Sequence, residues 1–354
     1  MTSRYAASRA EVAALLDGWG EPAYRATQVW DSLYRQLQPI EDASTLARPL
    51  RAQIADALPP SLELVTRATA RDAMTTKWLW ACTRDDAQIE TVLMRYPTRA
   101  TVCVSSQAGC AMGCTFCATG QAGFERHLDA GEIVEQVARA AHESPQPVRN
   151  VVFMGMGEPL ANYDPVWSAI ERLHHDVGIS ARRITVSTVG VVPGILRLAR
   201  ERLPVTLAVS LHAAIDEDRR VLVPLDDRYP IAAVLDAAAE FAGARGRRVT
   251  FEYACIEGVN DSPHQAEALG RLLGPFPGPG GAHVNLIPLN PTAGFGGAAS
   301  PTPRLRAFAD RLRAHGITAT VRRNRGTDIA AACGQLRSRD AIPREGPPSA
   351  RMGP

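Results

Sequence analysis

The chain has 354 residues, of which 45% are hydrophobic, which is enough for one large domain with a sizeable core and a smaller second one. Its formal net charge of +2 does not require a nucleic acid as partner, and it is compatible with a local basic surface. No apolar signal region follows the first residues and no run of about 18 apolar residues occurs, so we expect a cytoplasmic protein without a membrane segment.

Residues 1–70 are predicted to form a small helical accessory domain. Apolar residues recur at helical spacing in Ala10–Trp19 and Ala26–Leu37, and Pro59 and Pro60 mark the end of this segment. Runs rich in β-branched residues follow, which predicts strands at Thr76–Cys82, Gln88–Tyr96 and Ala100–Ser105. We therefore expect residues 71–99 to form a β extension before the main domain.

Residues 100–337 alternate between apolar strand-like runs and helical runs. Asp129 and Glu132 have the spacing of a helix capping box, and Ile231–Ala244 is a clear helical run. The predicted strands are Asn150–Met154, Arg183–Ser187, Val205–Ser210, Val249–Cys255, His283–Pro288 and Thr318–Arg322. This alternation is typical of an α/β fold with a parallel sheet, and with the strand before residue 110 it predicts an incomplete barrel. Residues 338–354 are expected to be a disordered tail, because they are rich in Arg, Pro and Gly.

Cys110, Cys114 and Cys117 have the spacing C-x3-C-x2-C. Three thiolates can bind three irons of a [4Fe–4S] cluster and leave the fourth iron open for a substrate or cofactor. A zinc site usually needs further Cys or His pairs at short spacing, and none follows here. The spacing therefore predicts an iron–sulfur centre. The odd total of seven cysteines argues against a disulfide framework.

Polar residues follow several of the predicted strands. Active sites of α/β barrels form beyond the carboxyl ends of the strands. In Gly155–Pro159, the glycines allow close approach of the backbone to a ligand and Glu158 is able to hold an ammonium group. The other candidates at strand ends are Ser187, Ser210, Leu211, His212 and Asn290. Each alone is explained equally well by a turn or a satisfied polar group, but their shared position favours a binding site.

The cysteine motif resembles that of the radical S-adenosylmethionine (SAM) enzymes, and Gly155–Pro159 resembles their motif for the SAM amino group. The resemblance implies a partial (βα)6 barrel and a [4Fe–4S] cluster on Cys110, Cys114 and Cys117. It implies that an electron from the cluster cleaves SAM to methionine and a 5′-deoxyadenosyl radical, with a flavodoxin or ferredoxin as electron donor. We expect SAM to contact Gly157, Glu158, Ser187, Ser210, Leu211, His212 and Asn290.

Four runs resemble the adenine-C2 RNA methyltransferases: Arg99–Cys110, Met154–Pro159, Ser210–His212 and Ala332–Leu336. They occur in the expected order, and the resemblance extends over roughly residues 20–336. That family is dual-specific, because it methylates an adenosine in the peptidyl-transferase centre of 23S rRNA and the adenosine 3′ to the anticodon in some tRNAs. The resemblance implies the same two RNA partners here, and we expect the protein to act as a monomer.

The resemblance also implies roles for residues outside the cluster. A first SAM methylates Cys333, the radical from a second SAM removes a hydrogen atom from that methyl group, and the resulting carbon adds to C2 of adenine. Glu90 corresponds to the proton acceptor, and Cys103 then forms a disulfide with Cys333 and releases the RNA. Without the resemblance, all three would be interpreted as strand or core residues. Cys82 and Cys255 match no motif position and are expected in the core.

Two other functions remain open at this point. A related family methylates carbon 8 of the same rRNA adenine, confers antibiotic resistance and uses the same cysteine pair; the similarity over the N-terminal segment favours carbon 2. A non-catalytic iron–sulfur or zinc module that binds RNA is the other. The basic clusters Arg182–Arg183, Arg245–Arg248 and Arg322–Arg325 are candidates for phosphate contacts or for solvated helix ends.

Overall fold

The computed structural model describes residues 2–336, so the predicted tail at 338–354 lies outside the described residues. Within that range a ten-stranded sheet has the order β1-β2-β3-β4-β7-β8-β9-β10-β11-β12. The first four strands pair antiparallel, and from β4 onward every neighbouring pair is parallel. The α/β barrel is as expected, with β12 adding a parallel strand to the six of the implied barrel. No helix between residues 2 and 336 is long and apolar enough to cross a bilayer.

The elements fall close to the predicted ranges. The strands are β1 (Leu62–Thr69), β2 (Thr75–Cys82), β3 (Gln88–Tyr96), β4 (Arg99–Cys103), β5 (Gln107–Gly109), β6 (Phe124–His127), β7 (Val148–Phe153), β8 (Ile184–Thr188), β9 (Thr206–Ser210), β10 (Thr250–Cys255), β11 (His283–Pro288) and β12 (Thr318–Val321). The helices are α1 (Arg9–Gly18), α2 (Tyr24–Trp30), α3 (Arg48–Ala57), α4 (Ala118–Ala122), α5 (Ala130–His142), α6 (Tyr163–His175), α7 (Val192–Arg200), α8 (Asp216–Leu222), α9 (Ile231–Arg245), α10 (Pro263–Leu273) and α11 (Thr302–Ala314).

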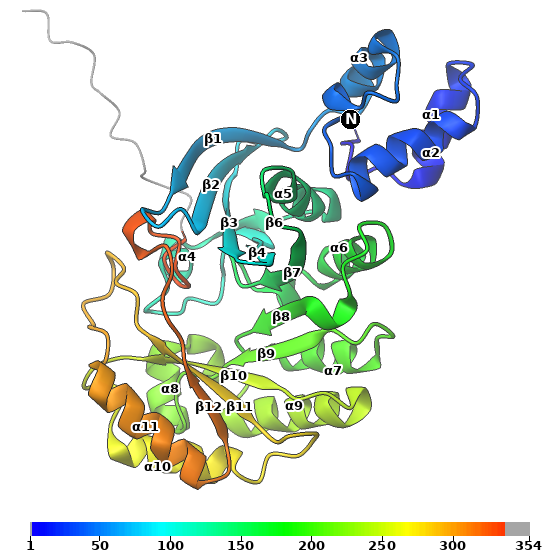
Figure 1. Cartoon of the computed structure of the whole chain (residues 1–354). Coiled ribbons are helices and arrows are strands. Elements are labelled where there is room, and N and C mark those ends of the chain that lie inside the picture. Colours follow the sequence, from blue (N-terminus) through cyan, green and yellow to red (C-terminus); the bar gives the residue numbers. More distant parts are fainter. Residues whose placement is uncertain (1, 337–354) are drawn as a thin grey trace, which may run out of the picture.

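Helices cover the outer face of the parallel strands, as Figure 1 shows for α5, α6, α7 and α9. The predicted capping box at the start of α5 is present, because the Asp129 carboxylate accepts from the Glu132 N–H at 2.8 Å and Glu132 accepts from the Asp129 N–H at 2.9 Å. Cys82 and Cys255 are fully buried in the main core, which confirms the prediction for both.

Strand β1 is a correction to the sequence-based prediction, because Leu62–Thr69 lies within the segment expected to be helical. β1 is an edge strand, and most of its side chains are at least partly exposed, so its apolar pattern is weak. The helices before it end with α3 at Ala57. The small antiparallel pair β5–β6 around the cysteine loop was also not predicted, since each strand is only three or four residues long.

The N-terminal helices α1–α3 lie to one side of the barrel, next to α5 and α6 (Figure 1). Arg172 of α6 donates hydrogen bonds to the carbonyls of Tyr5 and Ala6, the latter at 3.0 Å. Trp30 Nε1 donates to Asp176 at 3.1 Å. Polar contacts therefore hold the N-terminal segment against the outer helices of the barrel, away from the strand ends.

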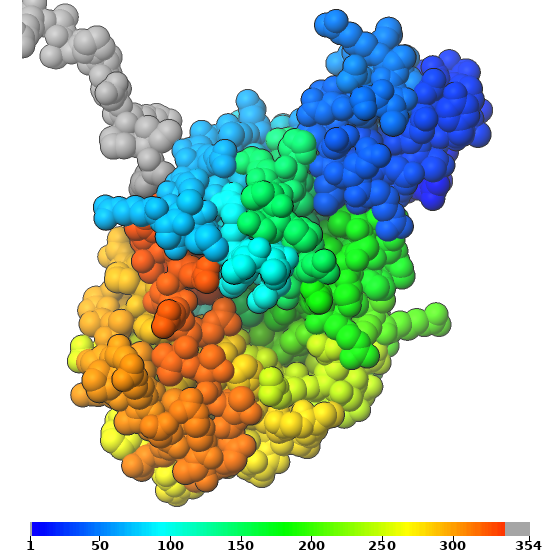
Figure 2. Space-filling model, in the orientation of Figure 1, coloured from blue at the N-terminus to red at the C-terminus, as the bar shows by residue number. Residues whose placement is uncertain are grey.

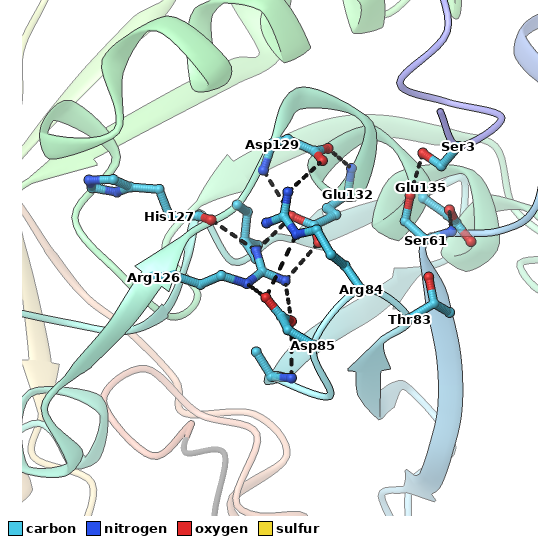
Figure 3. Close-up of polar contacts among 12 residues, drawn as sticks. Ser3, Ser61, Thr83, Arg84, Asp85, Arg126, His127, Asp129, Glu132 and Glu135 are labelled. Carbon is cyan, nitrogen blue, oxygen red and sulfur yellow. Dashed lines mark hydrogen bonds and ion pairs between the residues drawn. The ribbon is translucent and has the colours of Figure 1, made fainter. Parts of the chain in front are cut away.

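A network of charged side chains fixes the turn between β2 and β3 (Figure 3). Arg126 lies 2.5 Å from Asp85 in this turn, and it also donates to both oxygens of buried Glu132 in the first turn of α5, at 2.8 and 2.9 Å. Glu132 is thereby shared between the helix cap and the turn. This network holds the β extension firmly against the barrel, which matters because β3 contributes to the site described next.

Candidate active site

A cavity of about 730 Å³ lies inside the barrel. The predicted site residues that line it are Cys103, Cys110, Cys114, Cys117, Gly157, Glu158, Ser187, Ser210, His212, Asn290 and Cys333. Two predicted residues do not line it. The Leu211 side chain is fully buried in the core, and Glu90 is buried at 3% exposure on β3. The barrel therefore brings most of the predicted site residues to a single cavity, whose size is typical of small-molecule sites.

The three clustered cysteines lie on a loop between β5 and α4. A Cβ atom at Gly120 of α4 would lie 2.9 Å from the backbone N and O of Cys114, so only glycine allows the helix to approach the loop this closely. Burial raises the pKa of Cys110 to about 12 and raises that of Cys114 as well; the nearby thiols and Glu158 raise both further. Thiolates are therefore disfavoured here unless a cationic centre binds them.

The donor set fits a cluster better than a single ion. Among residues 2–336, no three His, Cys, Asp or Glu side chains are grouped so that they could hold one metal ion. A [4Fe–4S] cluster does not need such convergence, because each thiolate takes a different iron. Three thiols on one loop at the wall of the cavity meet this requirement.

Glu158 is buried beside the cluster loop, at 2% exposure. Its oxygens accept from the N–H groups of Leu160 at 3.0 Å and Val189 at 2.9 Å. Burial raises its pKa to about 7, although these backbone hydrogen bonds oppose the shift. Gly157 has φ +98°, and a Cβ atom there would lie 2.5 Å from Gln107 Cβ. The glycine therefore lets this loop come close to the β5 strand, with the carboxylate held at the cavity.

His212 is held in an unusual backbone conformation, with φ +62°. Its Nδ1 accepts a hydrogen bond from the Ala254 N–H at 3.0 Å, which leaves the ring proton on Nε2. Burial and the charge of Arg219 lower its pKa to about 3, so the imidazole is neutral at physiological pH. It is therefore suited to donate one hydrogen bond into the cavity and unsuited to carry a proton. Ser187 and Ser210 lie near it, with their Oγ atoms 3.4 Å apart.

Asn290 connects the strand ends to Cys333. Its Nδ2 donates to the Cys333 carbonyl at 3.0 Å. Its Oδ1 is buried, and no described residue forms a hydrogen bond with it. A buried acceptor in this state is normally satisfied by a ligand or water, which fits a cofactor with donor groups such as SAM.

Cys103 and Cys333 come from distant parts of the chain to the same part of the cavity. Cys103 ends β4 and is buried in an apolar cluster with Val92, Met156, Ala331 and Leu336. Cys333 is exposed toward the cavity, where loss of hydration and the charge of Glu252 raise its pKa. Burial also raises the pKa of Cys103, and the proximity of Cys333 raises it further.

Residues 324–336 form what we call the C-terminal strap. It runs from β12 across to the β extension, and Figure 2 shows its orange-red surface beside the light-blue surface of that extension. The Lys77 ammonium donates to the Ala330 carbonyl at 3.1 Å, and the Asp328 carboxylate accepts from the Arg71 N–H at 2.9 Å. Thr119 Oγ1 donates to the Leu336 carbonyl at 2.5 Å. Because β4 and β12 do not pair, the strap covers the side on which the barrel is open, and it carries Cys333 there.

Glu90 lies on the same face of β3 as Val92 and Met94, both of which line the cavity. Its carboxylate forms an ion pair with Lys77, with Nζ and Oε1 2.7 Å apart. Lys77 thus contacts both Glu90 and the strap that carries Cys333. No sequence motif indicates Lys77, and none indicates the cavity-lining residues Glu252 and Asn285. Glu252 and Asn285 could have been recognised in the sequence, because each is a polar residue within a predicted strand that is otherwise mostly apolar.

Comparisons with known proteins agree with this geometry. Residues 104–268 match the model of the radical SAM superfamily. A probable dual-specificity RNA methyltransferase RlmN from Parafrankia sp. (strain EAN1pec) is 52% identical, over 93% of this chain and 90% of that protein. The chain belongs to the RlmN family. An RlmN from Chloroflexus aurantiacus is 48% identical, over 94% of this chain and 92% of its own length.

The crystal structure of a radical SAM methyltransferase from Sphaerobacter thermophilus has a TM-score of 0.90 and 48% identity to this RlmN-family chain. The match covers 96% of this chain and 100% of that one. The predicted family, the radical SAM α/β fold and the methyltransferase class are thereby confirmed. Membership in an enzyme family also removes the non-catalytic RNA-binding module from consideration.

Proposed function

We propose that this RlmN-family enzyme methylates carbon 2 of an adenosine in the peptidyl-transferase centre of 23S rRNA and of the adenosine 3′ to the anticodon in tRNAs. The observation that carries the proposal is the meeting of Cys103 and Cys333 at the cavity that also contains the three clustered cysteines. Dual-specificity RNA methyltransferases among the close relatives support the RNA substrates.

Cys110, Cys114 and Cys117 would each hold one iron of a [4Fe–4S] cluster. SAM would be held by Gly157, Glu158, Ser187, Ser210, His212 and Asn290. When bound, the cluster supplies the electron that cleaves SAM to the 5′-deoxyadenosyl radical. The backbone of Leu211 is part of the same segment, although its side chain is in the core. A flavodoxin or ferredoxin as electron donor, a monomeric state and a cytoplasmic location complete the proposal.

Cys333 is the methyl carrier in this mechanism. Its thiol must lose a proton before its sulfur can bond to a methyl group, and the charge of Arg322 favours that loss while burial and Glu252 oppose it. After loss of one hydrogen atom, the Cys333-bound carbon forms a bond to C2 of the target adenine. Protein and RNA are then covalently joined through the sulfur of Cys333.

Glu90 and Cys103 complete the reaction. Glu90 accepts the proton from C2, and its ion pair with Lys77 keeps the carboxylate oriented. One electron must also leave the adduct, and a bound cluster, oxidised by the earlier cleavage of SAM, would supply the acceptor for it. The Cys103 thiolate then attacks the sulfur of Cys333, so that an S–S bond forms and the S–C bond to the RNA methylene breaks. The electron pair of the broken bond goes to that carbon, which takes up a proton to become the methyl group. An external dithiol must reduce the resulting disulfide before the next turnover.

The first experiment is an anaerobic assay of reconstituted protein with SAM and fragments of 23S rRNA and tRNA. Nucleoside mass spectrometry should detect 2-methyladenosine in both RNAs, together with 5′-deoxyadenosine. Detection of 8-methyladenosine instead would establish the antibiotic-resistance type of activity. Absence of 5′-deoxyadenosine from protein with a full cluster would refute the proposed enzyme.

The roles of the two cysteines are tested separately. Cys103→Ala should form the covalent protein–RNA adduct but not resolve it, so a stable adduct should appear on denaturing gels. Cys333→Ala should form no adduct. If Cys103→Ala forms no adduct although its Cys333 is methylated and loses a hydrogen atom from that methyl group, the role of Cys103 is wrong. If Cys333→Ala forms an adduct, Cys333 is not the methyl carrier.

A further inference from the structure

A row of polar side chains crosses four neighbouring strands inside the barrel. Ser210, Glu252, Asn285 and Thr320 are consecutive partners in the parallel register of β9, β10, β11 and β12. All four line the cavity. The row begins at Ser210, a residue proposed to contact SAM, and ends on the strand that leads into the strap. It therefore lies between the proposed SAM site and the side from which the strap carries Cys333.

The strands on the other side of the same cavity contribute an apolar patch together with the polar side chains of Arg99, Thr101 and Asn150. The patch is formed by Val92 and Met94 on β3, Cys103 on β4, Val152 on β7 and Met154 just after it. A cavity with an apolar patch and a row of polar groups suits a flat heteroaromatic ring, whose faces are apolar and whose edge carries hydrogen-bonding groups. The base that must leave its stack to react at Cys333 is such a ring.

Glu252 is the charged member of the row and is only 6% exposed. Its Oε1 accepts from Asn285 Nδ2 at 2.8 Å, and no described residue donates a hydrogen bond to Oε2. Burial raises the pKa of Glu252, whereas the bond from Asn285 and the charge of Arg322 lower it. Because Glu252 lines the cavity, this oxygen is placed to accept a hydrogen bond from an N–H group of a ligand.

Glu252 is also close to the reacting sulfur. Its negative charge is one of the causes that raise the pKa of the Cys333 thiol. A group bound to Glu252 is therefore held near the atom that delivers the carbon. In adenine, the exocyclic amino group and C2 belong to the same ring of the base, so one can be bound while the other faces Cys333.

We propose that Glu252, oriented by Asn285, accepts a hydrogen bond from the exocyclic amino group of the target adenine and thereby selects adenine over 6-oxopurines. This assignment rests on the proposed function, because it presumes an RNA adenine as substrate. Hypoxanthine carries a hydrogen at C2 like adenine, but presents a carbonyl at C6, which a carboxylate repels. The adenine of SAM carries the same amino group, so SAM is the other ligand that is able to donate this hydrogen bond to Glu252.

The test compares wild type with Glu252→Gln on an rRNA fragment that carries adenosine or inosine at the target position. Asn285 should continue to donate to the amide oxygen of the glutamine, which turns the amide N–H2 toward the cavity. That group opposes the amino group of adenine and suits the carbonyl of inosine. The adenosine-to-inosine ratio of single-turnover rates should therefore fall by about 10- to 100-fold, as expected for a hydrogen bond to a charged group. Equilibrium binding of the same two RNAs to SAM-free protein should shift in the same direction.

Controls separate this effect from loss of structure and from a role toward SAM. Thr185→Val removes a different polar group from the cavity and should keep the wild-type ratio. Asn285→Ala leaves the Glu252 carboxylate in place without its fixed orientation, and it should lower the adenosine-to-inosine ratio by about 3- to 10-fold. This variant provides the test of the proposal if Glu252→Gln does not fold. Methylation of Cys333 without RNA, measured against SAM concentration, reports on the SAM site.

Three outcomes would overturn the assignment. An unchanged ratio in both Glu252→Gln and Asn285→Ala would exclude a contact with the target base. A raised SAM requirement for Cys333 methylation, with an unchanged ratio, would assign Glu252 to the adenine of SAM. Failure of the wild type to methylate adenosine RNA despite SAM cleavage would refute the proposed function and the subsite with it, whereas normal wild-type activity with an unchanged ratio refutes the subsite alone.

Discussion

At the scale of single residues, the site is notable for buried charges with specific partners. Glu90 is paired with Lys77, Glu252 is held by Asn285, and Glu158 is bound by backbone N–H groups. Burial of such groups is costly unless their hydrogen bonds are satisfied, so each indicates a function at that position. Two predictions follow from these groups.

Lys77 should orient the proton acceptor and hold the strap in place, because it forms an ion pair with Glu90 and donates a hydrogen bond to the Ala330 carbonyl. In Lys77→Met, the release of methylated RNA should slow by about 10²-fold, which is the lower end of what a positioned general base contributes. The protein–RNA adduct should accumulate, while Cys333 methylation continues. Lys77→Arg should restore part of the rate. Quantifying adduct and methyl-Cys333 in the same samples distinguishes this from general damage, which would reduce both.

Glu158 should make the stability of the cluster-free protein depend on pH. Its folded-state pKa of about 7 lies above the usual value for Glu, so its contribution is complete below pH 4.5 and is lost as pH rises through 7. Relative to wild type, the free energy of unfolding of Glu158→Gln should therefore rise by about 2.5 kcal/mol between pH 5 and pH 8. Denaturant unfolding at both pH values measures this difference. A difference that is constant with pH would contradict the raised pKa.

At the scale of elements, close backbone packing around the cysteine loop is the main requirement. Helix α4 follows Cys117 directly, and Gly120 within it touches the backbone of Cys114. The strap bonds to the same helix through Ala118 and Thr119. The loop that holds the cluster cysteines and the segment that carries Cys333 are therefore joined through one short helix.

Gly120→Ala should displace this loop, because its Cβ atom would lie 2.9 Å from two backbone atoms of Cys114. We expect at least a severalfold loss of bound iron after reconstitution, measured by iron content and by absorbance of the cluster. Gly243→Ala is a matched control, since it is also helical and its Cβ atom would meet nothing within 4 Å. The control should bind iron normally and be stabilised by about 0.5–1 kcal/mol. Normal iron binding by Gly120→Ala would show that the loop adapts.

Particular residues show how far the sequence predicts this structure. The runs Asn150–Met154 and Val249–Cys255 predicted their strands, because β-branched and aromatic residues such as Val151, Phe153 and Phe251 are buried at alternate positions of each strand. β1 was missed because an exposed edge strand lacks that pattern. In the site, residues with motif spacing were found, whereas Glu252 and Lys77 were not. Their partners lie on neighbouring strands, and no local pattern reports such pairs.

At the scale of the whole molecule, the N-terminal helices share a hydrophobic core with the barrel, and side chains of its outer helices also bind them through hydrogen bonds. Arg172 of α6 donates to the carbonyls of Tyr5, Ala6 and Ala7 and to the Tyr34 hydroxyl. This half-buried residue therefore connects two parts of the chain that are far apart in sequence. Its removal should loosen the attachment without changing the cavity.

Arg172→Met should increase amide hydrogen exchange in residues 3–36 by about 10-fold or more, since several hydrogen bonds to a charged group are lost. Exchange in β7–β12 should be unchanged, and so should SAM cleavage in the absence of RNA. Arg197→Met removes an exposed ion pair with Asp164 on the same side of the barrel, so hydrogen exchange and SAM cleavage should both stay at their wild-type values. Equal exchange in Arg172→Met and wild type would mean that other contacts hold the helices.

The position of the strap has a consequence for how the enzyme is made. Because residues 324–336 follow all strands of the sheet in the chain, they leave the ribosome after the strands have been synthesised. Until the strap docks on Lys77 and Thr119, the cysteine loop is reachable from the open side of the barrel. Biosynthesis thus brings Cys333 to the cavity last, after the cysteine loop and every strand of the sheet have been made.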